Sequence, residues 1–148
     1  MNLGDKVAQH GLGNFKVGVK KLCDLLSNTN KRLLVVGGAG SLYVDKKHTK
    51  QVMDDPDFPD IFKPLAKAQG KALEELRKRN DVKWTFISPA SDFQAEGKRT
   101  GKYILGGEEL TLNSKGESII SYADYAIAMI DEAVEGKHIQ ERISVVVE

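Results

Sequence analysis

The chain has 148 residues and a mass of 16.3 kDa, the size of one ordinary domain, and 41% of its residues are hydrophobic. Its 22 basic and 21 acidic side chains give a formal charge of +1, which offers no electrostatic case for nucleic acid or an anionic membrane as partner. The sequence has no apolar run near the roughly 20 residues of a membrane span and no start typical of a secretory signal. With a single cysteine, Cys23, these features predict a reducing, cytoplasmic location.

The N-terminal segment is expected to contain a loop followed by a helix. Residues 1–13 are interrupted by glycines and show no sustained hydrophobic period, so we expect a loop there. From Asn14, the expected cap, apolar residues recur at helical spacing as far as Leu26. Cys23 lies on this apolar stripe, which favours a packed core thiol over a reactive one.

Two segments are typical of strands in a parallel sheet. Arg32–Val36 is a continuous apolar run bounded by glycines, which predicts a strand buried on both faces. Val82–Ser88 is rich in aromatic and β-branched residues and ends at Pro89. Between them we expect a long loop over residues 42–60 and a helix over residues 60–79.

The last third of the chain predicts a small β excursion, a helix and a final strand. Ser121 to Asp124 matches a capping box and opens a helix whose apolar positions include Ala126, Ile127, Ile130 and Val134 and which ends at Gly136. Strands are expected at Tyr103–Leu105, Glu109–Leu112, Ser118–Ile120 and Arg142–Val147. The order of elements predicts one α/β domain, residues 1–148, with a parallel sheet and flanking helices.

The glycine cluster after the first strand is a weak match to a dinucleotide-binding turn. Gly38 and Gly40 fit its first two positions, but Tyr43 stands where the third glycine belongs, and no helix begins there. A tight turn that brings Ser41 to the carboxyl edge of the sheet, where ligands of open α/β sheets bind, is the better interpretation.

No metal site is expected. The acidic cluster at residues 54–60 lacks the glycine and the distal glutamate of a calcium loop, and the three histidines are far apart in sequence. The segment Arg99–Tyr103 carries two cations, a hydroxyl and an aromatic ring. It fits a loop that closes over an anionic or planar ligand about as well as it fits a solvated hairpin.

Five motifs in order resemble one known family. They are Arg32–Leu42, Pro56–Pro59, Trp84–Ala90, Arg99–Tyr103 and Ile120–Ala128. Together they resemble the NADH-flavin-reductase-like, or NmrA-like, branch of the atypical short-chain dehydrogenase/reductases. The resemblance covers nearly the whole chain from about Asn14 onward.

The resemblance implies a Rossmann-like fold of which this chain is the C-terminal portion. Members of the family open with a strand and a Gly-rich turn for the cofactor pyrophosphate, and no such segment is found here. The strands present correspond to strands 5, 6 and 7 of the family's sheet, which are neighbours. One edge of Arg32–Val36 is then expected to lack its partner strand, which predicts a homo-oligomer or a partner chain at that edge.

The resemblance also implies the site residues. Gly37, Gly38, Ala39, Pro89, Ala90 and Ser91 correspond to the strand ends around the nicotinamide. Ser41 and Tyr103 are the implied catalytic residues, and Phe93 and Arg99 the implied substrate-binding residues. The wider superfamily's Tyr-x-x-x-Lys pair is replaced by Phe62 and Ala66.

Three functions follow from this comparison. The first is NAD(P)H-dependent hydride transfer to a flavin or quinone-like acceptor. The second, which the loss of Tyr-x-x-x-Lys permits, is a non-catalytic NAD(P)-sensing module. The third is an inactive fragment, because the pyrophosphate turn is absent and NAD(P)H binding by this chain alone is in doubt.

Overall fold

The fold was analysed in a computed structural model that describes residues 3–148, with side chains from Phe15 onward. The chain forms three α-helices, two short 3-10 helices and six strands within this range. In chain order they are α1 (Leu3–Leu26), β1 (Arg32–Val36), η1 (Val52–Asp54), η2 (Asp60–Phe62), α2 (Lys63–Arg77), β2 (Lys83–Ser88), β3 (Asp92–Gln94), β4 (Tyr103–Gly106), β5 (Ile119–Ser121), α3 (Tyr122–Glu135) and β6 (Glu141–Val147).

The main sheet has the strand order β1-β2-β6-β4. β1, β2 and β6 are parallel, with Val35 opposite Phe86 and Ile87 opposite Ile143, whereas β4 pairs antiparallel with β6. β3 and β5 form a separate parallel pair. This mixed α/β architecture, with helices covering a parallel sheet, confirms the fold class expected from the sequence.

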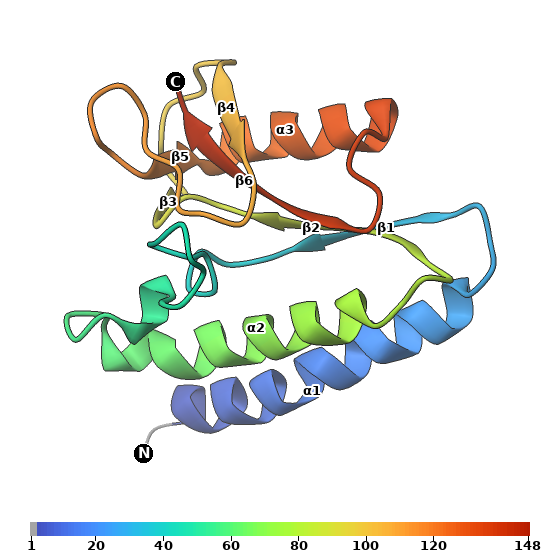
Figure 1. The fold of residues 1–148 in the computed structure, drawn as a ribbon. Helices are drawn as coiled ribbons and strands as arrows, with labels where there is room; N and C mark the ends of the chain where they lie inside the picture. Colours follow the sequence, from blue (N-terminus) through green and yellow to red (C-terminus); the bar gives the residue numbers. More distant parts are fainter. Residues whose placement is uncertain (1–2) are drawn as a thin grey trace.

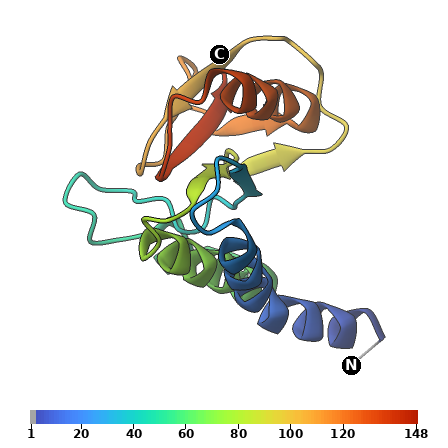
Figure 2. The ribbon, with the colours of Figure 1, turned by 90° about the vertical axis from the view of Figure 1, so that its right-hand side faces the viewer.

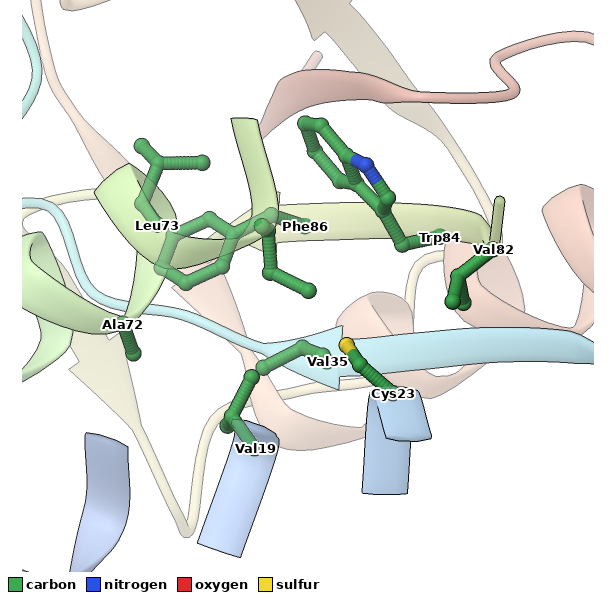
Figure 3. Packing of buried hydrophobic residues seen from close by; sticks show 9 residues of the cluster. Val19, Cys23, Val35, Ala72, Leu73, Val82, Trp84 and Phe86 are labelled. Atoms are coloured by element: carbon green, nitrogen blue, oxygen red, sulfur yellow. The ribbon is translucent and has the colours of Figure 1, made fainter. Parts of the chain in front are cut away.

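The helices cover the two faces of the main sheet. α1 and α2 lie side by side on one face and α3 lies on the other (Figures 1 and 2). Successive residues of β2 point to opposite faces, so Trp84 and Phe86 pack under α1 and α2, whereas Ile87 packs toward α3. Figure 3 shows the first of these clusters, in which Cys23 is fully buried as expected. Burial raises the pKa of the Cys23 thiol, which suits a packed and unreactive group.

The N-terminal helix differs from the sequence expectation. We expected a loop over residues 1–13 and a cap at Asn14, but α1 begins at Leu3; only Met1 and Asn2 lie outside the described residues. Interior glycines cost a helix about 1 kcal/mol each relative to alanine, which made this segment look like a loop. α1 runs alongside α2, and the Lys16 ammonium lies 3.2 Å from the Glu75 carboxylate. Tertiary packing thus outweighs the local preference.

The segment between β2 and α3 also differs from the expectation: one expected strand is missing, and one short strand, β3, was not expected. Glu109–Leu112 is not a strand, because Glu109 makes only an isolated bridge to Tyr43 in the loop after β1. β3 was not anticipated, since three residues with one aromatic side chain give almost no periodic signal.

Two apolar surfaces remain uncovered. β1 is the edge strand of the main sheet, so Val36 is 48% exposed rather than buried on both faces. On α3 the buried positions include Tyr125, Ala128 and Glu132, not the predicted stripe. Ile130 and Val134 are 62% and 81% exposed. We call the exposed residues Tyr122, Ala126, Ile130 and Val134, spaced four apart, the outer stripe of α3.

No helix in the part of the chain that the structure describes is both long and apolar enough to cross a membrane.

Candidate functional site

The turn after β1 is built from glycines because its backbone lies against other groups. The Gly37 amide donates to the Ile87 carbonyl oxygen at 2.9 Å, which extends the pairing of β1 with β2 beyond the strand. A Cβ on Gly37 would clash with the Phe86 ring, and one on Gly38 with the side-chain amide of Gln69. The Phe86 ring is fully buried and cannot move aside, so glycine is required at Gly37, whereas the flexible Gln69 side chain could shift to admit a side chain at Gly38.

A cleft of about 480 Å³ opens at this edge, between the ends of β1 and β2 and the start of α2. We call it the strand-end cleft. It is lined by Gly37, Gly38, Ala39, Gly40, Phe58, Phe62, Leu65, Ala66, Gln69, Pro89, Ala90, Ser91, Asp92, Phe93 and Tyr122. All six residues predicted to contact the cofactor line this cleft, and so does the predicted substrate residue Phe93. The strands are parallel, and this geometry places their carboxyl ends side by side.

Aromatic rings form much of the wall of the strand-end cleft. The Phe93 ring centroid lies 4.3 Å from that of Tyr122 and 4.9 Å from that of Tyr125, in tilted arrangements. Phe58 and Phe62 enter from the segment before α2, and the Phe62 side chain is 54% exposed. Concave, largely apolar clefts with a few polar groups are the usual form of small-molecule sites. This wall suits a flat ring.

The charges around the strand-end cleft are few. Asp92 is the one carboxylate or cation among its described lining residues. A dinucleotide pyrophosphate is normally held by backbone amides at a helix N-terminus or by cations. The described lining is therefore mainly apolar and provides no cationic side chain to hold the phosphates of a dinucleotide.

Ser41 lies outside the strand-end cleft and is almost fully buried. Its hydroxyl oxygen accepts a hydrogen bond from Arg142 Nη1 at 3.0 Å, and its carbonyl oxygen accepts one from Nη2 at 3.1 Å. It lines a second, smaller hollow, which shares no lining residue with the strand-end cleft.

Tyr103 and Arg99 are also absent from the lining of the strand-end cleft. The Tyr103 hydroxyl donates to Asp131 at 2.6 Å, and burial together with that carboxylate raises the pKa of Tyr103 to about 12. Arg99 is exposed in the loop before β4. The structure thus gathers seven of the ten predicted site residues in one cleft and places Ser41, Tyr103 and Arg99 elsewhere.

Asp124 fixes the loop that carries Arg99. Its carboxylate accepts hydrogen bonds from the Thr100 and Gly101 amides, both at 2.9 Å, and from the Thr100 hydroxyl at 2.7 Å. Burial would raise the pKa of Asp124, but these hydrogen bonds hold it below its ordinary value. The buried carboxylate therefore stays ionised and ties the loop to the start of α3.

The sequence reasoning did not assign Phe58, Leu65, Gln69 or Tyr122 to the site. Phe58 stands inside the quoted Pro56–Pro59 motif, so the motif itself was a usable signal. The sequence comparison identifies Phe62 only as the residue at the tyrosine position of the superfamily's Tyr-x-x-x-Lys pair. Nothing in the sequence shows that Tyr122 turns its ring toward Phe93.

Comparisons with known proteins show what the chain is similar to. No family model matches it. It is 51% identical over 117 residues to the uncharacterised protein YwnB of Bacillus subtilis strain 168, a match that covers 79% of this chain and 55% of YwnB.

Two solved structures extend the comparison. A Streptococcus pneumoniae TIGR4 protein with the provisional description NADH-flavin reductase superposes with a TM-score of 0.92 at 51% identity, over 95% of this chain and 67% of that one. A Bacteroides thetaiotaomicron protein provisionally described as an epimerase has a TM-score of 0.72 at 42% identity, over 79% of this chain and 53% of that one. The chain therefore spans little more than half of YwnB and about two thirds of the streptococcal protein.

Proposed function

Because the chain belongs to the family of the streptococcal NADH-flavin-reductase-like protein, whose fold is of the short-chain dehydrogenase/reductase type, we propose that it serves NAD(P)H-dependent reduction. The strand-end cleft would hold the nicotinamide ring. The observation that carries this proposal is the gathering of Gly37–Ala39, Pro89–Ser91 and Phe93 around one aromatic-walled cleft at the carboxyl edge of the sheet.

The acceptor is a planar ring, either a flavin or a quinone-like molecule. Phe58, Phe62, Phe93 and Tyr122 provide faces and edges against which a flat ring can stack. NAD(P)H, when bound, supplies the hydride. The protein's part is to bring the two rings together and exclude water between them.

Hydride transfer leaves the acceptor as an anion, which takes its proton from solvent, so the reaction does not require an acidic side chain in the cleft. Phe62 and Ala66 stand where the superfamily has tyrosine and lysine, and Phe62 carries no proton to give. For Ser41 and Tyr103 we propose positioning roles. Ser41 holds the turn after β1 through Arg142, and Tyr103 ties β4 to α3 through Asp131. Arg99, on the loop held by Asp124, would meet an acceptor only at the outer rim.

A second candidate is a module that binds NAD(P) without turnover. The replacement of the superfamily's tyrosine and lysine by Phe62 and Ala66, and the absence of cations among the described lining residues, favour it. The two functions separate on whether NADH or NADPH is consumed when an acceptor is added. A chain that neither binds nor consumes the cofactor would fit the third possibility, an inactive fragment.

The test uses the 148-residue chain with NADH or NADPH and riboflavin, whose lack of a phosphate matches a cleft with an acidic residue and no basic one among its described lining residues. We expect nicotinamide absorbance to fall with time, and riboflavin to work at least as well as its phosphorylated form. Phe62→Ala should raise KM for riboflavin several-fold because it removes a stacking ring. Leu112→Ala is the matched control, since Leu112 is 51% exposed and lies outside the cleft. Equal effects of both variants, or no binding by the folded chain, would contradict the proposal.

A further inference from the structure

We infer that a second hollow, between α2 and the loop after β1, is a binding site for a small phosphate-class anion. The hollow has a volume of about 220 Å³ and shares no lining residue with the strand-end cleft. Lys67, Lys71 and Arg77 from α2, Tyr43 from the loop and Arg142 from β6 all line it. We call it the cationic hollow. This site does not depend on the proposed reductase function.

Positive charge is concentrated in the cationic hollow although the whole chain carries only +1. Lys67 and Lys71 have no carboxylate partner among the residues whose side chains the structure describes. Glu108 sits between two guanidinium groups, 2.7 Å from Arg77 Nη2 and 2.7 Å from Arg142 Nη2. One carboxylate cannot balance two cations, and Glu108 lies outside the lining, in which Glu74 is the one acidic residue among the described residues. Four cations therefore face two carboxylates.

Arg142 contributes positive charge to the cationic hollow, but its N–H groups already donate to protein acceptors. Its Nε and Nη2 donate to Glu108, and Nη1 donates to the hydroxyls of Ser41 and Ser88 at 3.0 and 3.4 Å. The Arg142 side chain is almost completely buried, so its field is weakly screened by solvent. The donors left for a ligand include the two ammonium groups, the Tyr43 hydroxyl, and Nε and Nη1 of Arg77, which contacts Glu108 through Nη2.

The shape of the hollow depends on Gly70. A Cβ at this helical position would lie 3.7 Å from both the Met53 methyl and the Ser41 Cβ, an ordinary contact, so alanine fits but takes up part of the space. On the other side the Tyr43 ring is held by stacking on His48, with centroids 4.5 Å apart. The volume lies below the roughly 300 Å³ at which drug-sized ligand pockets begin, so an anion of phosphate size fits and a whole dinucleotide does not.

The experiment is a calorimetric titration of the chain with inorganic phosphate at constant ionic strength. We expect saturable binding, at least tenfold weaker in the double variant Lys67→Gln/Lys71→Gln. The control is Lys20→Gln/Lys21→Gln, which removes two exposed lysines of α1 and should leave the affinity unchanged. Gly70→Ala should also weaken binding while keeping or raising thermal stability, because alanine favours the helix.

Several outcomes decide the matter. No saturable binding to the folded chain, or an equal loss in both double variants, would overturn the inference. Competition by NADP but not by NAD would support it and identify the phosphate source as the cofactor's extra phosphate; competition by neither would support a free anion. Phosphate binding that persists in Phe62→Ala would show that the cationic hollow binds its anion independently of the strand-end cleft. A failure of the proposed reductase function would then not count against this site.

Discussion

The guanidinium of Arg142 donates to both the hydroxyl and the carbonyl oxygen of Ser41, although the two residues are 101 positions apart in the chain. This link joins β6, through the sheet, to the turn after β1. It gives the turn a support independent of its own glycines. Gly37, Gly38, Ala39 and Gly40 of that turn line the strand-end cleft, and Ser41 lines the cationic hollow.

Replacing Arg142 should therefore destabilise the fold. Arg142→Met removes the buried partner of Ser41, Ser88 and Glu108 and leaves their oxygens short of donors, so we expect a loss of about 3 kcal/mol in the free energy of unfolding. Urea denaturation followed by tryptophan fluorescence measures it. Arg77→Met, at the exposed end of the same network, should cost less than about 1 kcal/mol. Similar losses in the two variants would refute the central role of Arg142.

Stability should fall in acid as Asp81 becomes protonated. Hydrogen bonds from Arg79 and then Ser27 lower the pKa of Asp81 from 3.8 to about 2. A carboxylate whose pKa is lower in the folded state stabilises the fold above its unfolded pKa, and this contribution is lost as the pH falls from about 4 to about 2. Thermal melts across this window should show a smaller drop for Asp81→Asn than for the unmodified chain. An identical drop would show that other groups dominate.

The phenol of Tyr103 should ionise at a higher pH than an ordinary tyrosine. Burial and the Asp131 carboxylate raise its pKa to about 12, so ultraviolet phenolate titration should show a component well above the ordinary value of 10. Tyr103→Phe should remove that component and cost about 1 kcal/mol of stability through the lost hydrogen bond. Titration of Tyr103 near pH 10 would mean that its contact with Asp131 does not hold in solution.

The open edge of β1 should associate with another chain, and we propose a second copy. β1 carries no proline, and Val36 is exposed beside unpaired backbone groups. The outer stripe of α3 adds further uncovered apolar surface. Light scattering after size exclusion should give a mass above 16.3 kDa.

The double variant Val36→Lys/Ile130→Glu tests this surface. It should return the chain to 16.3 kDa while the chain stays folded, because both side chains are already exposed; the melting temperature should lose only the part that association contributes. Leu112→Glu, at another exposed position, should leave the association intact. If the unmodified chain is a monomer at every concentration tested, the proposed self-association is wrong.

Local signals were strong enough to predict most elements. The apolar runs ending at Gly37 and Pro89 placed β1 and β2 almost to the residue. Ser121 accepts from the Asp124 amide and Gly136 adopts a left-handed conformation, so both ends of α3 could be predicted from its caps.

Long-range pairing could not be predicted in the same way. The choice of buried face on α3 depends on Glu132, whose carboxylate lies 2.9 Å from Arg32 Nη2, and a buried glutamate is invisible to a hydrophobic pattern. Phe58 and Phe62 reach the cleft along a loop whose path the sequence does not reveal. Ser41 was placed correctly at the strand end, but its side chain is turned away from the cleft lining by a partner on β6.

The most direct test of the central claim is to titrate the ¹⁵N-labelled chain with a phosphate-free N-benzyl dihydronicotinamide and follow the backbone amides. Because we propose that the strand-end cleft holds the ring, and because its described lining has no cation for the phosphates, we predict saturable shifts at Gly37, Gly38 and Ser91, reduced in Phe62→Ala. Lys67 and Lys71 should not respond. Shifts that avoid these strand ends, or no shifts in a folded sample, would contradict the assignment of this cleft to the nicotinamide ring.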